Sequence, residues 1–543
     1  MRVRKFTFPA VTRPSKCYFQ TVTKRWNSVS QRPGSDRLRF PGAIDSKFTT
    51  NLDFTRPSNK KAMPTYRILD QDGVIVDKSR EPTDISDEHL IKMYKDMLSV
   101  SIMDIIMFDA QRQGRISFYM VSAGEEGIAV GSTSALDPSD PIFAQYRETG
   151  IFKYRGFTPA DFMNQLYANK HDPGLGRNMP VHYGSMKYHI HTISSPLATQ
   201  IPQASGAAYA VKMQNAMNPK DTQRCVACYF GEGAASEGDF HAALNIAATR
   251  KCPVIFICRN NGYAISTPTL EQYRGDGIAS RGVGYGIDTI RVDGNDILAV
   301  REVTKEARKM CLEDGGKPIL IEAMSYRVSH HSTSDDSFAY RAKVEVEDWK
   351  RRDNPITRLR KWMEGKGIWD DEKEKEARAV LKKEILDAFK QAEKEKRPAL
   401  RNMMEGVYEE LTEEQKEQME KLRTIIEKYP DEYDVTHKYR SFTHFTYTTH
   451  TQTKRSPNPP DPPRRQQYLS GFDKDTLSAY NTVRGWDQLP IPVYRDWPEE
   501  ISHREWDSIK RERERERQRK AHAKEQKNKQ KEKKRKQVKI SPW

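Results

Sequence analysis

The chain has 543 residues and a formal net charge of +16, so it is long enough to bury a large hydrophobic core. The charge lies at the two ends: residues 1–35 hold eight Lys or Arg and no acid, and residues 510–539 hold sixteen Lys or Arg and five Glu. The rest of the chain carries −3, so a nucleic-acid-binding surface on the folded body is not expected. No apolar run reaches the ~18 residues of a membrane span.

The N-terminal region has two predicted parts. Residues 1–39 are rich in Arg, Ser and Thr and lack the apolar core of a secretory signal, which is typical of a mitochondrial transit peptide. A disordered basic arm is the alternative. Residues 40–65 are predicted to be an extended arm, because Pro41-Gly42, Pro57 and Pro64 interrupt any helix. The main folded domain is predicted to span residues 66–440.

The first long element of that domain is an amphipathic helix that begins near Ser86 and ends at about Arg112. Further along, Gln145-Tyr146-Arg147 follows Phe143 at a predicted strand end. The planar guanidinium of Arg147 suits a phosphate group, although a surface salt bridge fits the residue type equally well. Residues 194–200 form a polar turn before a helix rich in Ala and Gly, which we expect to be buried and central.

The centre of the chain is a βαβ unit at residues 224–267. Cys225–Phe230 and Val254–Cys258 are short apolar runs that predict two buried parallel strands. Between them, Gly231-Glu232-Gly233 predicts a tight turn, and Ser236 with Asp239 predicts a helix start. Such units are almost always right-handed, so both strands end at the same edge of the sheet.

That edge is where we expect a ligand site. Glu232 and Asn261 each follow the carboxyl end of one of these strands, which is where open α/β sheets bind ligands. A carboxylate, an amide oxygen and a backbone carbonyl are ligands that Mg²⁺ accepts together with phosphate oxygens. The N-terminus of the intervening helix would point free N–H groups at the same place.

The six cysteines do not predict a disulfide framework or a zinc site. Cys225 and Cys228 form a C-x-x-C, but within a strand residues three apart point to opposite faces of the sheet. We therefore expect both thiols to pack in the core. Free thiols are consistent with a reducing compartment.

A polar loop follows a further apolar strand. Ile319–Met324 predicts that strand, and the loop at 326–341 carries His330, His331 and several Ser and Asp residues. Adjacent histidines cannot easily face one ion, so zinc is not expected. A loop after a buried strand is a frequent functional position, and a solvated polar loop is the alternative.

The last part of the chain is rich in charge. Residues 345–428 predict exposed amphipathic helices with many ion pairs, anchored to the body by Trp362 and Trp369. Residues 441–543 contain a proline-rich segment at 456–465 and a basic tail, predicted to be largely disordered or a solvated helix. Binding of this tail to nucleic acid or an anionic membrane remains an alternative.

Several motifs together carry a family resemblance. GEGAASEGD at 231–239 followed by RNNGYAIST at 259–267 resembles the thiamine diphosphate motif. Further matching stretches are QRQGRISFYM (111–120), QYRETG (145–150), MPVHYG (179–184), SSPLATQIPQA (194–204), YRGDGIA (273–279), RVDGND (291–296) and HHSTSDDS (330–337). Over about residues 40–440 the chain resembles the alpha subunits of mitochondrial branched-chain 2-oxo acid dehydrogenases, in their decarboxylating component.

The resemblance implies a three-layer, thiamine-diphosphate-binding α/β fold with a mostly parallel sheet and helices on both faces. It implies thiamine diphosphate, Mg²⁺ and K⁺ as cofactors, a catalytic His331 and phosphorylation at Ser332. The implied contacts of thiamine diphosphate are Gln145, Tyr146, Arg147, Ser195, Leu197, Gly231, Glu232, Gly233, Ala234, Arg259, Asn261 and His331. The implied metal ligands are Glu232, Asn261 and Tyr263 for Mg²⁺, and Ser194, Pro196, Thr199 and Gln200 for K⁺.

The resemblance also implies partners and a location. It implies a beta subunit in an α₂β₂ heterotetramer, a lipoyl acyltransferase core, a regulatory kinase and phosphatase, and the mitochondrial matrix. The implied activity is oxidative decarboxylation of branched-chain 2-oxo acids, with transfer of the acyl group to lipoyl groups. Three alternatives remain open: a pyruvate dehydrogenase alpha subunit, an interaction or nucleic-acid-binding protein that acts through its basic tail, and a degenerate subunit without cofactor.

Overall fold

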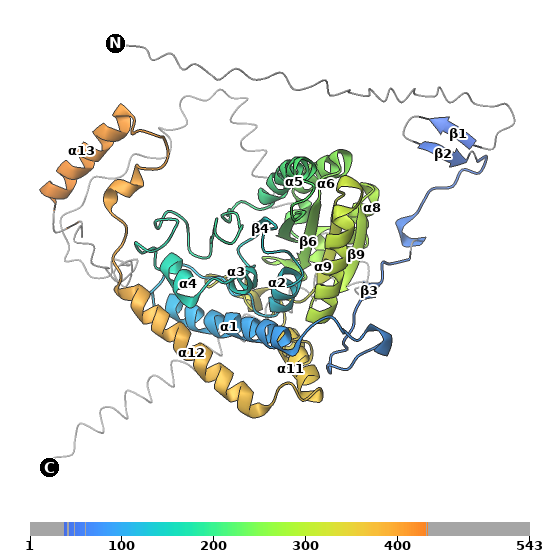
Figure 1. Ribbon diagram of the computed structural model, residues 1–543, viewed down its shortest axis with the longest axis horizontal. Coiled ribbons are helices and arrows are strands. Elements are labelled where there is room, and N and C mark those ends of the chain that lie inside the picture. Colours follow the sequence, from blue (N-terminus) through green and yellow to red (C-terminus); the bar gives the residue numbers. More distant parts are fainter. Residues whose placement is uncertain (1–36, 41–42, 48, 60, 430–431, 433–543) are drawn as a thin grey trace, which may run out of the picture. The chain divides into compact units, whose positions relative to one another are not determined.

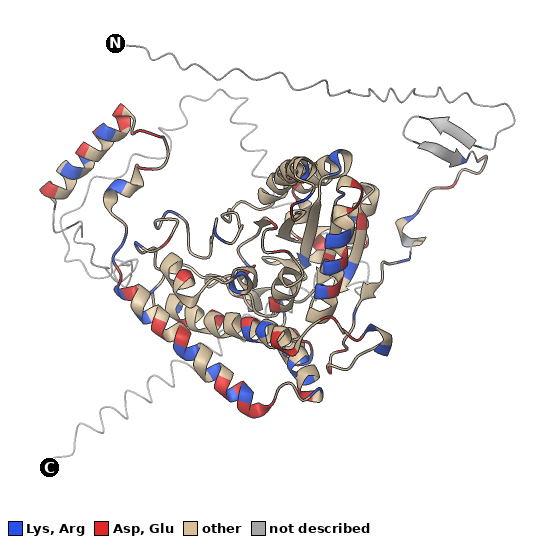
Figure 2. Cartoon of the chain, in the orientation of Figure 1, with Lys and Arg blue, Asp and Glu red and all other residues tan. Residues whose placement is uncertain are grey.

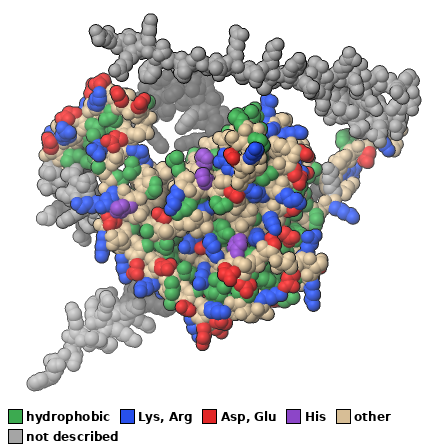
Figure 3. Space-filling view, viewed as in Figure 1, with side chains coloured by type: hydrophobic (Ala, Val, Ile, Leu, Met, Phe, Trp, Pro, Cys, Tyr) green, Lys and Arg blue, Asp and Glu red, His purple; other side chains and the backbone are tan. Residues whose placement is uncertain are grey.

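The structure is a computed structural model of the chain, and it describes residues 37–40, 43–47, 49–59, 61–429 and 432. The predicted transit peptide, apart from its last residues, and the Pro-rich and basic tail lie outside these residues. None of the helices in the described part of the chain has the length and apolar character that a membrane span needs. Basic and acidic side chains are interspersed over the face of the body seen in Figure 3.

A six-stranded sheet forms the centre of the body (Figure 1). Its order is β3-β9-β10-β6-β5-β4, and every paired neighbour is parallel. The strands are β3 (Thr65–Tyr66), β4 (Ile142–Phe143), β5 (Val226–Gly231), β6 (Val254–Asn260), β9 (Asp288–Asp293) and β10 (Ile319–Met324). The predicted strands of the βαβ unit are confirmed as β5 and β6, which pair from Val226 and Val254 to Gly231 and Arg259. Their carboxyl ends therefore lie together.

Helices cover one face of the sheet through α5 (Gln200–Met217), α6 (Gly238–Arg250) and α8 (Ala279–Gly284). The side chains of β5 at Val226, Cys228 and Phe230 point into this core, as the strand period of two requires. The prediction that α5 is a central, buried helix is wrong for one of its faces in the single chain. Only one face of α5 packs against β5 and α6, while Tyr209 and Met213 on its other face are exposed.

Helices on the opposite face complete the third layer, which confirms the predicted fold class. Here α9 (Ile297–Leu312) packs on β9 and β10, and α2 (Glu126–Thr133) packs on α9. Outside them lie α1 (Asp87–Arg112), α3 (Thr149–Arg155), α4 (Pro159–Leu166), α11 (Pro355–Gly365) and α12 (Asp371–Lys394). The two cysteines of the C-x-x-C are free and buried. Cys225 lies in the core on this side of the sheet, and Cys228 lies in the core on the side of α5, α6 and α8.

Helix boundaries follow local side-chain chemistry. The prediction for α1 is confirmed, and the Ser86 hydroxyl accepts a hydrogen bond from the His89 backbone N at 3.3 Å. The predicted anchors Trp362 and Trp369 are buried, and Trp369 Nε1 donates to Glu374 Oε2 at 2.9 Å. Figure 2 shows the expected mixture of basic and acidic side chains along α12.

Two predicted elements differ from the structure. The helix of the βαβ unit begins at Gly238, two residues after Ser236, because a 3₁₀ turn (Ala234–Ser236) comes first, and no side chain caps α6. In the arm predicted to be extended, β2 (Ala43–Lys47) is indeed extended, but it pairs antiparallel with β1 (Arg37–Phe40), a pairing that was not predicted. The remaining helices and strands are β7 (Tyr263–Ala264), β8 (Thr267–Pro268), α7 (Thr269–Gln272), α10 (Lys343–Arg352) and α13 (Glu413–Lys428). The other 3₁₀ turns are Pro57–Asn59, Lys78–Arg80, Glu313–Gly315, Ser337–Ala339 and Leu400–Met403.

Candidate active site

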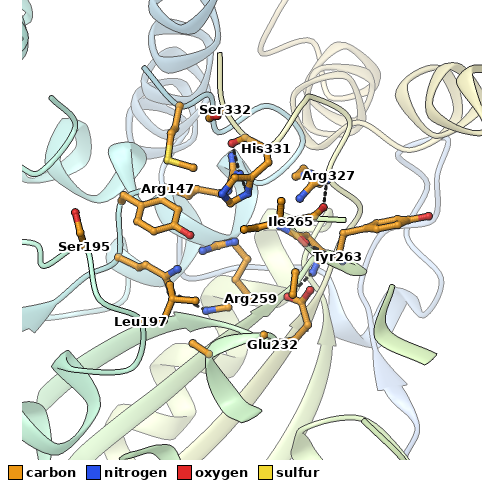
Figure 4. A pocket seen from close by; sticks show the side chains of 18 of the residues that line it. Arg147, Ser195, Leu197, Glu232, Arg259, Tyr263, Ile265, Arg327, His331 and Ser332 are labelled. Atoms are coloured by element: carbon orange, nitrogen blue, oxygen red, sulfur yellow. Dashed lines mark hydrogen bonds between the residues drawn. The ribbon is translucent and has the colours of Figure 1, made fainter. Parts of the chain in front are cut away.

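A cavity of about 490 Å³ lies where β5 and β6 end (Figure 4). Every residue for which the resemblance implies a contact with thiamine diphosphate lines it: Gln145, Tyr146, Arg147, Ser195, Leu197, Gly231, Glu232, Gly233, Ala234, Arg259, Asn261 and His331. Tyr263, the third residue of the predicted Mg²⁺ set, and Ser332 also line it. These residues come from strand ends and loops far apart in the sequence, so the fold brings the predicted set to one place.

Glu232 is the carboxylate at the floor of this cavity. It is 1% exposed, and its Oε2 accepts a hydrogen bond from the Asn261 backbone N at 3.3 Å. Its Oε1 is buried and has no hydrogen-bond partner among the described residues. Burial raises the pKa of this carboxyl, and the nearby Arg259 acts in the opposite direction. A buried carboxylate oxygen without a partner is costly, and a bound cation would satisfy it.

A buried ion-pair cluster holds the neighbouring groups in place. Arg259 pairs through Nη1 with Glu125 and through Nε with Glu148, both at 2.8 Å, while its Nη2 has no partner among the described residues. Glu125 also accepts from Asn261 Nδ2 at 2.9 Å. Because the amide nitrogen is turned toward Glu125, Asn261 Oδ1 is left as an acceptor, and the Tyr263 backbone N donates to it at 3.2 Å.

Arg147 and His331 form the opposite wall. Arg147 Nη1 donates to the Val121 carbonyl at 2.6 Å, and its Nη2 approaches His331 Nδ1 at 3.0 Å and the His331 carbonyl at 2.5 Å. A guanidinium can only donate, so His331 Nδ1 is the acceptor and the neutral ring carries its proton on Nε2. Burial lowers the pKa of His331 to about 3, and Arg147 and Arg327 add to this effect. The imidazole is therefore neutral at physiological pH.

The loop that carries His331 is held by a chain of hydrogen bonds. The His331 backbone N donates to Asp335 Oδ2 at 2.7 Å, and the Tyr340 hydroxyl donates to the same oxygen at 2.7 Å. Arg327 Nη2 donates to Tyr340 Oη at 2.6 Å and to the Ile265 carbonyl at 2.7 Å. Ile265 has a φ of 54°, which is rare for a β-branched residue, so this contact holds a strained turn at the cavity.

Several cavity residues had no role in the sequence analysis. They are Phe118, Met120, Met179, His182, Glu237, Ala264, Ile265, Gln272 and Arg327. Phe118 and Met120 lie in QRQGRISFYM, and Met179 and His182 lie in MPVHYG, so the resemblance marks both stretches without indicating which side chains point inward. Arg327 is 1% exposed, and its Nε and Nη1 have no partner among the described residues. Only the fold indicates that this arginine lines the cavity.

The residues of the predicted K⁺ site lie beside the cavity. None of Ser194, Pro196, Thr199 and Gln200 lines it, although Ser195 and Leu197 between them do. Gln200 is buried, and its Nε2 donates to the Tyr229 carbonyl at 2.9 Å. Ala198 within this turn has a φ of 64°, a left-handed backbone conformation that is uncommon for residues other than glycine.

Two comparisons identify the family. A model described as "Dehydrogenase E1 component" matches residues 94–401. The mitochondrial 2-oxoisovalerate dehydrogenase subunit alpha of Mus musculus is 51% identical over 402 residues, which are 74% of this chain and 89% of that protein. The chain belongs to the dehydrogenase E1 component family. The proteins of the same name from Caenorhabditis elegans (50% over 403 residues, 74% of this chain and 92% of that protein) and Dictyostelium discoideum (54% over 391 residues, 72% and 87%) are also similar.

Membership of the E1 family confirms the predicted cofactor class, because the family depends on thiamine diphosphate. The cavity fits such a group. Its floor offers the unpaired Glu232 oxygen and the Asn261 amide oxygen, and Arg147, Arg259 and Arg327 bring positive charge that suits a diphosphate. The chain is thus an oxo acid dehydrogenase subunit of the E1 type, as predicted.

Proposed function

We propose that this chain is the alpha subunit of the mitochondrial, thiamine-dependent component that oxidatively decarboxylates branched-chain 2-oxo acids. The observation that carries the proposal is the single cavity in which Glu232, Asn261 and Arg259 converge, in a chain whose similar relatives carry 2-oxoisovalerate in their names. The apolar side chains of Phe118, Met120 and Leu197 line the same cavity, and they favour a branched aliphatic group over the small methyl group of pyruvate.

The cofactor would be held at its diphosphate end by this chain. Glu232, Asn261 and the Tyr263 carbonyl are proposed to bind Mg²⁺, and Arg259 would neutralise phosphate charge through its unpaired Nη2. When bound, thiamine diphosphate supplies a thiazolium that acts as the electron sink for decarboxylation. His331 would donate a hydrogen bond from Nε2 to negative charge that develops on the reacting group, because its Nδ1 is occupied by Arg147.

The K⁺ site is proposed for the turn at 194–200. Hydroxyl and carbonyl oxygens of Ser194, Pro196, Thr199 and Gln200 are suited to a hard monovalent cation. The left-handed backbone conformation of Ala198, with its φ of 64°, supports the proposal because such strain often marks a functional turn. An ion there would stabilise the loop that carries Ser195 and Leu197 into the cavity.

A partner subunit is proposed to close the cavity. Leu197 and Ile265 line it yet are 38% and 53% exposed, so apolar surface stands open at its mouth. A beta subunit in an α₂β₂ assembly would cover this surface and would supply the acid that activates the aminopyrimidine ring. The acyl group would then pass to lipoyl groups of an acyltransferase core.

Regulation by a kinase and a phosphatase at Ser332 is proposed as well. Ser332 is half-buried, lines the cavity and directly follows His331. A phosphate brings about −1.5 to −2 charges, which would repel a diphosphate and the Asp335 carboxylate that holds the His331 backbone. The second serine that the family often carries ten residues on is Ala342 here, so control would depend on Ser332 alone.

The domain boundaries also belong to the proposal. Residues 1–39 would direct import into the matrix, residues 40–65 would contact the partner subunits, and residues 66–440 would form the catalytic domain. No role in this activity is assigned to residues 441–543. The match to the E1 family favours an enzyme over an interaction protein built around the basic tail.

Substrate profiling of the complex tests the proposed activity. The chain would be purified with its beta-subunit partner, and decarboxylation of 3-methyl-2-oxobutanoate, 4-methyl-2-oxopentanoate and pyruvate would be measured with thiamine diphosphate and Mg²⁺. We expect kcat/KM for the two branched acids to exceed that for pyruvate by more than about tenfold. Preference for pyruvate would contradict the branched-chain assignment, and a complex that binds no cofactor would indicate a degenerate subunit.

A further inference from the structure

A serine and a histidine meet at the edge of the cavity, and the proposed binding of the cofactor gives His182 no role. Ser195 Oγ lies 2.5 Å from His182 Nε2, and both residues line the cavity. His182 is buried, whereas Ser195 is exposed to the cavity. The pair therefore joins a fixed, enclosed base to a hydroxyl group that a ligand can reach.

The protons of this pair can be placed from its other contact. His182 Nδ1 lies 2.9 Å from the Pro180 carbonyl oxygen, which can only accept, so Nδ1 carries the ring proton. Nε2 of the neutral ring is then an acceptor, and the Ser195 hydroxyl must donate to it. The serine has one proton, and that proton is turned away from the cavity. Its oxygen lone pairs are thus left for groups inside the cavity.

The backbone next to His182 is held in an unfavourable conformation that aims the ring. Val181 has a φ of 66°, a left-handed conformation that is costly for a β-branched residue by about 1–3 kcal/mol. Gln165 of α4 holds it there, because its Oε1 accepts from the Val181 backbone N at 3.1 Å and its Nε2 donates to the Met179 carbonyl at 2.8 Å. Strain of this kind persists only where the surroundings impose it, and here it fixes His182 against Ser195.

The pair and Glu232, a proposed metal ligand, belong to different parts of the cavity wall. In Figure 4, Ser195 lies at the left of the view and Glu232 near its lower centre. The Tyr146 ring lies 6.5 Å from the His182 ring and 6.3 Å from the His331 ring, so it connects the pair with the catalytic histidine. The pair and His331 therefore share Tyr146 as a neighbouring ring.

We propose that His182 is a positioning residue for the reaction: it holds the Ser195 hydroxyl so that its oxygen accepts a hydrogen bond from an N–H or O–H group of the reacting ligand. The inference rests on the proposed function, since it assigns a role within that reaction. The group that donates to Ser195 is a hydroxyl or an amino group, and it belongs to the substrate or to the cofactor. Without His182, the serine proton is free to rotate into the cavity, and the acceptor is lost for part of the time.

A double-mutant cycle in the complex with the beta subunit tests this role. His182→Met fills the site but removes the acceptor, His182→Gln places an amide oxygen near the position of Nε2, and Ser195→Ala removes the hydroxyl. At saturating thiamine diphosphate, we expect His182→Met to lower kcat/KM for the branched 2-oxo acid about tenfold, which corresponds to about 1.4 kcal/mol. His182→Gln should restore most of this loss. His182→Met/Ser195→Ala should be no worse than Ser195→Ala alone.

The controls separate the possible outcomes. His191→Gln alters an exposed histidine of the same loop whose ring stacks on Phe143 and not on the pair, and it should behave as the wild type. Wild-type turnover is measured first, and its absence would reject the proposed function itself. If the wild type turns over, two results would overturn the inference. One is a double variant whose loss of activity equals the product of the two single-variant losses, and the other is equal activity of His182→Met and the wild type. If His182→Met fails to assemble, full loss of activity in assembled His182→Gln overturns it and retained activity supports it.

Discussion

At the scale of single residues, the cavity is defined by groups whose partners are incomplete. Glu232 Oε1, Arg259 Nη2 and two nitrogens of Arg327 are buried without hydrogen-bond partners among the described residues. Folded proteins leave few such atoms, and a bound ion, a water molecule or a catalytic role can account for them. Three residues of this kind around one cavity indicate that the site is arranged for a charged ligand at some cost in stability.

Removal of the Glu232 carboxylate should abolish Mg²⁺-dependent cofactor binding while the fold remains intact. Glu232→Ala should weaken thiamine diphosphate binding more than about a hundredfold, since even outer-shell metal partners are worth 10–100-fold. The fold should tolerate the change because burial already raises the pKa of this carboxyl and so disfavours its charged form. Isothermal titration with cofactor and Mg²⁺ measures the effect, with Glu232→Asp as the conservative control. Wild-type affinity in Glu232→Ala would remove Glu232 from the site.

The neutral state of His331 has a consequence for stability at low pH. Its pKa falls from the ordinary value of 6.5 to about 3 in the folded chain. Below pH 6.5 the unfolded chain therefore takes up a proton that the folded chain does not, and stability is lost progressively as the pH falls toward about 3. Between pH 6.5 and 4, the urea concentration at the unfolding midpoint should fall less for His331→Asn than for the wild type. His189→Asn, at an exposed histidine, serves as control, and parallel curves for wild type and His331→Asn would contradict the neutral assignment.

At the scale of elements, residues at strand ends and helix starts hold the neighbouring segments in place. Asp296 begins α9 and is fully buried, and it accepts from four backbone N–H groups: Ile68 at 2.7 Å, Leu69 at 2.6 Å, Leu298 at 3.1 Å and Ala299 at 3.2 Å. One carboxylate thus caps a helix and fastens the segment that follows β3. The RVDGND stretch that resembles the family pattern has a structural role here.

Asp296→Ala should destabilise the fold strongly. The change removes a helix cap, worth about 1 kcal/mol, and leaves buried N–H groups unpaired at about 1–3 kcal/mol each, so we expect a loss of more than about 3 kcal/mol. Urea unfolding followed by circular dichroism measures it. Asp296→Asn keeps one acceptor oxygen and should lose less. Equal stability of Asp296→Ala and wild type would show that solvent replaces these bonds.

The loop at 326–341 is the element on which regulation would act. Phosphorylation of Ser332 should lower activity more than about tenfold, because the added charge lies beside His331 and the Asp335 carboxylate that fixes the loop. Kinase treatment, mass mapping and an activity assay test this, and Ser332→Glu should mimic part of the loss. Ser332→Ala should be resistant to the kinase, while Ser334→Ala should not. Full activity at stoichiometric phosphorylation of Ser332 would refute the switch.

At the scale of the whole molecule, this chain should be inactive by itself. Apolar side chains at the cavity mouth are exposed in the single chain, Leu197 at 38% and Ile265 at 53%. A partner that covers them would also exclude water, which strengthens the electrostatic interactions in the site. We expect no turnover by the purified chain and full turnover after addition of the beta subunit, with an α₂β₂ mass by light scattering. Turnover by the single chain would overturn the partner assignment.

The sequence alone predicted the features that depend on local pattern. The strands β5, β6 and β10, the start of α1 at Ser86 and the placement of Cys225 and Cys228 on opposite faces all follow from periods of two and 3.6 and from capping chemistry. The proximity of Glu232 and Asn261 also followed, because consecutive parallel strands with a helix between them end at one edge. The match of many short stretches to one family then indicated which residues to expect around them.

Only the tertiary structure decided the features that depend on contacts distant in sequence. The delayed start of α6 and the half-exposed α5 depend on a 3₁₀ turn and on packing that no local pattern encodes. The neutral state of His331 depends first on its burial and then on Arg147, and the position of its proton on Nε2 depends on Arg147, 184 positions away. The orientation of His182 toward Ser195 depends on Gln165, which holds Val181 in a left-handed conformation. Burial, proton position and strain are set by surroundings that exist only once the chain has folded, so the sequence indicated part of the cavity lining and the fold supplied the rest, together with the chemical states of the side chains.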